Sequence, residues 1–174
     1  MRLGAAASVL LSLLATPAWC GSTLTTEQEK VLSSWLAQHS NYRLATDADC
    51  DCADDIKQMR EGYGDASAAV RDYHPYVATG DFNGDRVEDF AVALIDGKAQ
   101  AGTFTLVVFN GPLSNRPSEP AFVKPDLQLL QEHLFYFGPP RPKPYRLFVG
   151  RFESDFGFTL EPSRRTYRIQ DSDQ

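Results

Sequence analysis

Short apolar runs rich in β-branched and aromatic residues recur through the second half of the chain and constrain its fold more than any other feature. The clearest runs cover residues 76–79, 90–95, 103–109, 145–152 and 166–169. Runs of this length and composition are typical of β-strands. The connection 96–102 begins with Asp-Gly and ends with Gly, which predicts antiparallel pairing of the strands that it joins. We therefore expect a mainly antiparallel sheet.

Helical patterns precede these runs. Residues 27–39 place four apolar side chains on one face, and Thr26 with Glu29 fits a capping box. Residues 53–60 predict a second helix, which Gly62 would end. A third, short helix is expected over residues 126–133. The resulting prediction is an α+β fold in which N-terminal helices pack on a mainly antiparallel sheet.

The intervening segments predict connections within one domain. Residues 61–72 are rich in Gly, Ala and Ser, and residues 110–125 contain four prolines, so both read as irregular. Residues 139–144 alternate proline with other residues, which favours a rigid surface loop of extended conformation. No regular repeat or domain linker is visible, and residues 21–174 are expected to form one domain.

The N-terminus has the pattern of a secretory signal peptide. Arg2 is the only charge among residues 1–20, the run 5–14 is almost wholly apolar, and Pro17 follows. Small residues fit cleavage after Cys20 or after Ala18. The apolar run is too short to span a bilayer, so we expect an exported chain without a transmembrane segment, in the periplasm or outside the cell.

The predicted export bears on the state of the three cysteines in the chain. Trp19 immediately before Cys20 disfavours lipidation of Cys20, because lipoprotein signals place a small residue there. Cys50 and Cys52 remain after cleavage, and an oxidising compartment favours a disulfide between them. A redox-active pair is the alternative. Metal binding by this pair is weakly indicated, because two further ligands would be needed.

The net charge of the chain argues against two classes of binding partner. The 174 residues carry a formal net charge of −6, whereas nucleic acids and anionic membrane surfaces select basic faces. Aromatic residues make up 11% of the chain, which is enough apolar surface for a packed core. A nucleic-acid partner is therefore not expected.

The segment most suggestive of chemistry is the loop 81–89. Oxygen-bearing side chains occupy its first, third, fifth and ninth positions: Asp81, Asn83, Asp85 and Asp89. Such groups, with the backbone carbonyl of Val87, are the ligands that Ca²⁺ prefers, and Gly84 permits a sharp turn between them. Without a cation the three carboxylates would repel one another. The alternative interpretation is a solvated acidic turn.

The loop is not an EF-hand, because its twelfth position is Val92 rather than a bidentate Glu. With a strand run on each side, it resembles the calcium loop of FG-GAP and VCBS-type repeats. The resemblance implies calcium ligands at Asp81, Asn83, Asp85, Val87 and Asp89. Arg86 departs from the family, which usually has Gly at that position. The motif occurs once, so it does not imply a complete propeller.

Other reactive residues give weaker signals. His74, just before a strand run, could act as a general base, but no nucleophile can be assigned to it, and a structural role is favoured. His39 and His133 lie in helical patterns. Glu88 and Glu153 would form a carboxylate pair only if the fold brought them together. The aromatic run 135–137 is expected in the core rather than in a ligand platform.

These features predict an exported calcium-binding domain that is not an enzyme. Ca²⁺ would stabilise a strand-loop-strand unit, and the surface would bind a protein or glycan, as in an interaction protein of the bacterial envelope. The alternative hypothesis is a small secreted hydrolase that uses acidic residues near the metal loop.

Overall fold

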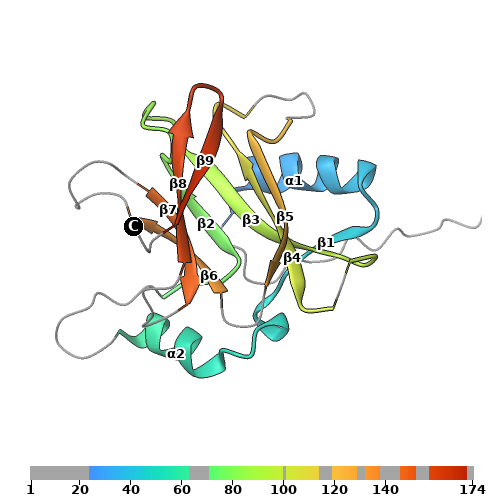
Figure 1. Ribbon diagram of the computed structural model, residues 1–174, viewed down its shortest axis with the longest axis vertical. Helices are drawn as coiled ribbons and strands as arrows, with labels where there is room; N and C mark the ends of the chain where they lie inside the picture. Colours follow the sequence, from blue (N-terminus) through green and yellow to red (C-terminus); the bar gives the residue numbers. More distant parts are fainter. Residues whose placement is uncertain are drawn as a thin grey trace, which may run out of the picture.

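The computed structural model describes residues 24–62, 71–99, 101–113, 119–128, 132–137, 146–151 and 157–171. Two α-helices, a short 3₁₀ helix and nine strands lie in these ranges (Figure 1). The helices are α1 (Thr26–Gln38), η1 (Asp47–Asp49) and α2 (Ala53–Glu61). The strands are β1 (Tyr42–Leu44), β2 (Val77–Gly80), β3 (Asp89–Asp96), β4 (Thr103–Phe109), β5 (Phe122–Gln128), β6 (Glu132–Phe137), β7 (Arg146–Arg151), β8 (Gly157–Ser163) and β9 (Thr166–Asp171).

β3 organises the first sheet. It pairs antiparallel with β4, which pairs in turn with the edge strand β5. β1 and β2 share the other edge of β3: β2 pairs with its first half and β1 with its end. β3 and β4 are buried on both faces, and this explains why their sequences are continuous apolar runs.

The second sheet is a four-stranded antiparallel meander, β6–β7–β8–β9. The two sheets approach each other on both sides. The Leu134 N–H donates to the Pro75 carbonyl at 2.7 Å beside β2, and the Thr166 hydroxyl donates to the Ala121 carbonyl at 2.9 Å beside β5. Figure 1 shows the second sheet standing across one face of the first.

Two hydrophobic clusters fill the space between three layers. Between the sheets, side chains such as Ala93 and Leu106 meet Leu147 and Leu160. On the opposite face of the first sheet, α1 packs Leu32 and its apolar neighbours against β3 and β4. The loop 81–89 lies at one end of this arrangement, between β2 and β3.

The predicted helices over 27–39 and 53–60 are confirmed as α1 and α2, although the cap of α1 is Thr25 paired with Gln28 rather than Thr26 with Glu29. Gly62 ends α2 as expected, with a φ of 85°. Two helices and antiparallel strands in one domain support the α+β class in its coarse form. The division of the strands into two open sheets was not predicted.

The predicted helix over 126–133 is wrong. Residues 122–128 form β5, and residues 132–137 form β6. Pro125 lies inside β5, where an edge strand tolerates the missing N–H. The signal peptide, most of the connection 61–72 and the proline-rich loop 139–144 lie outside the described residues.

Candidate functional site

The loop 81–89 closes the β2–β3 hairpin, in which Gly80 pairs with Asp89. Phe82 is 1% exposed and packs in the core between the sheets, so it anchors the start of the loop. Gly84, Asp85 and Arg86 are exposed at its tip. The loop therefore has a fixed base and an accessible tip.

Side-chain oxygens hold the loop in shape by accepting backbone N–H groups. The two carboxylate oxygens of Asp81 accept from Gly84 N at 2.7 Å and from Arg86 N at 3.0 Å. Asn83 Oδ1 accepts from Asp85 N, and Asp85 Oδ1 accepts from Val87 N. Gly84 has a φ of 80° and Arg86 a φ of 74°. Arg86 thus takes the left-handed conformation for which glycine is favoured.

Asp89 lies beneath the loop rather than at its surface. Its side chain is fully buried and accepts three backbone N–H groups, from Phe82, Asn83 and Gly111, at 2.9, 3.3 and 2.9 Å. Burial raises the pKa of Asp89 to about 6, against the lowering effect of the three N–H donors. Asp89 therefore fastens the loop to the turn that follows β4.

The side-chain oxygens of the loop are of the kind that binds a hard cation, but in this structure they do not converge on a single metal position. Among the described residues, no group of three or more His, Cys, Asp or Glu side chains is placed to hold a metal ion. The Asn83 side-chain amide donates to Asp85 Oδ2 at 3.0 Å. The Asn83 side chain would have to rotate before its own oxygen and the Asp85 carboxylate could face the same cation. Glu88 instead accepts from Gln28 of α1 at 3.0 Å. Asp81 and Asn83 are half-buried and Asp85 is exposed, so these three side chains lie at or near the surface.

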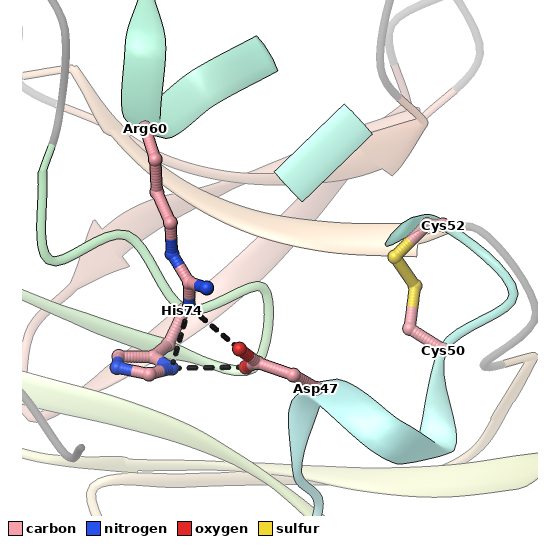
Figure 2. The surroundings of a disulfide bond; sticks show 5 residues. All are labelled: Asp47, Cys50, Cys52, Arg60 and His74. Atoms are coloured by element: carbon pink, nitrogen blue, oxygen red, sulfur yellow. Dashed lines mark hydrogen bonds and ion pairs between the residues drawn. A yellow bond between two sulfur atoms is a disulfide. The ribbon is translucent and has the colours of Figure 1, made fainter. Parts of the chain in front are cut away.

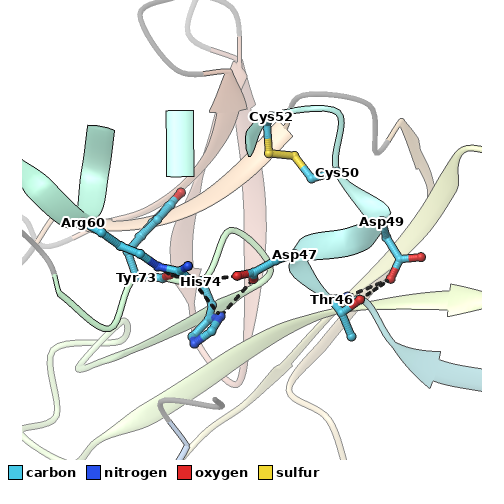
Figure 3. Close-up of polar contacts among 8 residues, drawn as sticks. All are labelled: Thr46, Asp47, Asp49, Cys50, Cys52, Arg60, Tyr73 and His74. Carbon is cyan, nitrogen blue, oxygen red and sulfur yellow. Dashed lines mark hydrogen bonds and ion pairs between the residues drawn. A yellow bond between two sulfur atoms is a disulfide. The ribbon is translucent and has the colours of Figure 1, made fainter. Parts of the chain in front are cut away.

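A second cluster, Asp47, Arg60 and His74, joins η1, α2 and the segment before β2 (Figures 2 and 3). Asp47 accepts from His74 Nδ1 at 2.9 Å and from Arg60 Nη2 at 2.5 Å. Arg60 also donates through Nε and Nη2 to the Tyr73 carbonyl, at 2.9 and 2.7 Å. The cluster is half-buried, with 21% of the His74 side chain exposed.

Electrostatics fixes the tautomer within this cluster. Burial raises the pKa of Asp47, but the hydrogen bonds from His74 and Arg60 outweigh it and hold the pKa below its usual range. An ionised carboxylate can only accept, so His74 Nδ1 carries the proton that Asp47 accepts. Sequence reasoning considered His74 but missed Asp47 and Arg60. These two residues are 13 positions apart, and no local spacing connects them to His74.

The predicted disulfide between Cys50 and Cys52 is confirmed. It lies between the end of η1 and the start of α2, where Cys52 is the buried N-cap residue (Figure 2). Asp49 and Thr46 brace the other side of η1 (Figure 3), and the hydrogen bond from Arg43 lowers the pKa of Asp49 to about 2. The bond acts as a local clasp.

The remaining candidates are dispersed. The ring of His39 stacks on Trp35 with centroids 3.9 Å apart, and its Nδ1 lies 2.8 Å from the Trp35 carbonyl, a structural placement at the end of α1. His133 lies in β6 rather than in the predicted helix. The aromatic run 135–137 also belongs to β6. Glu153 and Cys20 lie outside the described residues, so the proposed Glu88–Glu153 pair stays a prediction.

Comparison with models of known families, with curated proteins and with solved structures gives no match for this chain. Within the described ranges, neither helix has the length and apolar character that crossing a bilayer would require. Function must therefore be argued from the chain's own residues.

Proposed function

We propose that this protein is an exported calcium-binding domain without enzymatic activity, in which Ca²⁺ stabilises the β2–loop–β3 unit and the remaining surface binds a partner. The ion would be held by Asp81, Asn83, Asp85, the Val87 carbonyl and Asp89, and Asp89 would have to exchange a backbone N–H that it accepts in this structure for the cation. A hard oxygen-binding cation there would neutralise three carboxylates that lie within nine residues of one another.

One observation carries the proposal: the loop already has the backbone turn of a calcium loop at its sixth position. Calcium loops of this spacing place glycine there for a sharp turn. Arg86 adopts a φ of 74° in its place, and its N–H donates to Asp81 at the first position. The turn is thus present although its usual residue is absent.

The proposed role is structural because the loop connects several parts of the fold. Asp89 bonds to the turn after β4, and Glu88 bonds to Gln28 at the N-terminus of α1. A cation that binds only the native loop would stabilise the whole domain by mass action. Export is supported by the signal-peptide pattern and by the Cys50–Cys52 disulfide.

The alternative, a hydrolase that uses acidic residues beside the loop, has less support. Asp89, the loop carboxyl with a raised pKa, is fully buried and bonded to three N–H groups, so it cannot touch a substrate. His74 and Asp47 form the one His–carboxylate pair among the described residues, and Asp47 is tied up by a further ion pair with Arg60.

The test is the melting temperature of residues 21–174 in EDTA and in rising Ca²⁺. At a hundredfold excess over Kd we expect a rise of about 5–10 °C, because such an excess contributes about 2.7 kcal/mol. Asp81→Asn keeps an oxygen that can accept N–H groups but removes the charge, so it should abolish the rise. Asp171→Asn, an exposed acid at the end of β9, is the matched control. An unchanged melting temperature at millimolar Ca²⁺ would reject the proposal.

A further inference from the structure

The outer edge of β9 is an open strand edge. β9 pairs with β8 over its full length, in six residue pairs, and no other strand of the described ranges pairs with it. Its last four residues, Arg168 to Asp171, are all exposed. Thr166 at its start is fixed to Ala121, so the open stretch begins after it. Unpaired N–H and C=O groups on such an edge are a template for another strand.

β5, the outer strand of the first sheet beside β4, is protected. It contains Pro125, which lacks an N–H, and Asp126 with a φ of 60°. Its pairing with β4 also shifts register between Phe104 and Leu106. Prolines and irregularities are two of the features by which proteins block edge pairing, and β9 has neither. Its exposed charges, Arg168 and Asp171, would instead select among partners.

Charge and apolar surface add a chemical preference to the open edge. Arg164, Arg165 and Arg168 are exposed, and within the described part of the chain none of them forms an ion pair. These three guanidinium groups lie within five residues and form a local basic cluster in a chain of net charge −6. Ile169, directly after Arg168, is 39% exposed and, with Val123, is one of the two exposed large hydrophobic residues described.

We propose that β9 binds an extended acidic peptide segment of a partner protein by adding it as a fifth strand to the second sheet. The main chain of the peptide would satisfy the free edge, its acidic side chains would face Arg164, Arg165 and Arg168, and an apolar side chain would cover Ile169. An anionic polysaccharide could pair with the arginines but would leave the strand edge and Ile169 unsatisfied. This inference rests on the interaction role proposed above, but not on calcium.

The experiment measures binding of a fluorescent octapeptide of alternating Glu and Val to residues 21–174 by anisotropy. We expect saturable binding that weakens with salt, and none for the octapeptide of alternating Lys and Val. Methylating alternate backbone nitrogens of the Glu–Val peptide removes its pairing N–H groups without changing its charge. Loss of binding on methylation supports strand addition; equal binding of the methylated peptide overturns it.

Matched variants test the surface. Replacing all three arginines by Gln should weaken peptide binding by about tenfold or more, since exposed ion pairs contribute modestly and add up. Ile169→Ser should weaken it, whereas Val123→Ser on β5 should not. Equal effects of these two variants would overturn the proposal. So would binding of heparin in place of the peptide. Elution as a dimer in gel filtration that the peptide does not dissociate would also overturn it, because a second copy would then occupy the edge.

The calcium proposal and the peptide-binding proposal can be rejected independently of each other. If Asp81→Asn abolishes the Ca²⁺-dependent rise in melting temperature but binds the peptide normally, both proposals stand. If no Ca²⁺ effect exists but the peptide binds, only the calcium site is rejected. If the Ca²⁺ effect exists and the peptide does not bind, only the role of β9 is rejected.

Discussion

The loop 81–89 contains two residues with positive φ that differ in how well they suit it. Gly84 has a φ of 80°, and a Cβ built on it would meet nothing within 4 Å. Arg86 has a φ of 74° and carries a Cβ that disfavours this conformation by about 1–2 kcal/mol. The loop thus contains one residue matched to its backbone and one that is strained.

These two positions predict effects of opposite sign. Gly84→Ala should lower the free energy of unfolding by about 0.5–1 kcal/mol, since the strain exceeds the gain from a less flexible unfolded chain. Arg86→Gly should raise it by a similar amount and should also strengthen Ca²⁺ binding by removing a neighbouring cation. Urea denaturation in EDTA measures the first effect and calcium titration the second. Loss of stability in Arg86→Gly would contradict the strain argument.

The buried carboxyl of Asp89 predicts a pH dependence. Burial raises its pKa to about 6, so its contribution to stability is fully present below the unfolded pKa of about 4 and is lost as the pH rises through 6. In EDTA, the free energy of unfolding should therefore fall between pH 4 and pH 7. Asp89→Asn, which does not titrate, should be less stable overall but should have a flatter profile over this range. Identical slopes for the two proteins would refute the assignment.

The turn after β4 depends on a close backbone approach. A Cβ on Gly111 would contact the Val87 side chain and lie 2.6 Å from the Glu88 carbonyl, both in the loop. A Cβ on Gly97, in the turn between β3 and β4, would lie at an ordinary 3.5 Å from the Asn41 carbonyl. Only the first turn is therefore intolerant of a side chain.

Gly111→Ala should thus cost about 1–3 kcal/mol, as overpacking does, and should disturb the N–H that Asp89 accepts. Gly97→Ala should change stability by much less. Chemical denaturation of the two variants gives the comparison. Similar losses in both would show that the approach of Gly111 to the loop does not limit the fold.

The elements predicted correctly are those whose apolar pattern is strong and local. β4 was expected at its observed bounds, and β3 and α1 within one residue at each end, because continuous or helical apolar runs dictate their burial. The disulfide was expected from the oxidising compartment that the signal-peptide pattern predicts. These features need no knowledge of the rest of the fold.

The missed elements depend on contacts distant in sequence. β1 is three residues long and exists because Tyr42 pairs with Asp96. In β5 the proline pointed to a loop, although an edge strand accommodates it. Asp47, Arg60 and His74 come from three separate segments, so only the folded chain brings them together. Conversely, the buried position of Asp89 could not be inferred from a motif that marks it as a ligand.

At the scale of the molecule, the two sheets share one core and should unfold together. Leu160 of β8 is fully buried between the sheets, whereas Trp35 lies in α1 on the far face of the first sheet. Leu160→Ala should cost about 2–5 kcal/mol. Trp35 is the sole tryptophan after residue 20, so its fluorescence reports on α1 alone.

In Leu160→Ala, the fluorescence midpoint in urea should therefore move as far as the midpoint of far-UV circular dichroism. Thr159→Ala, the neighbouring residue on the opposite face of β8, should leave both nearly unchanged. A shift confined to circular dichroism would mean that the second sheet unfolds by itself.

The position of α1 has a consequence for how the chain is made. Its docking surface belongs largely to β3 and β4, so the stripe that contains Leu32 and Trp35 is fully covered only after residue 109 has been synthesised. The meander β6–β9, in contrast, pairs each strand with its immediate neighbour. Since chains emerge N-terminus first, the earliest element waits longest for burial. During synthesis, the apolar stripe of α1 therefore waits longer for its full set of packing partners than the strands of the meander wait for theirs.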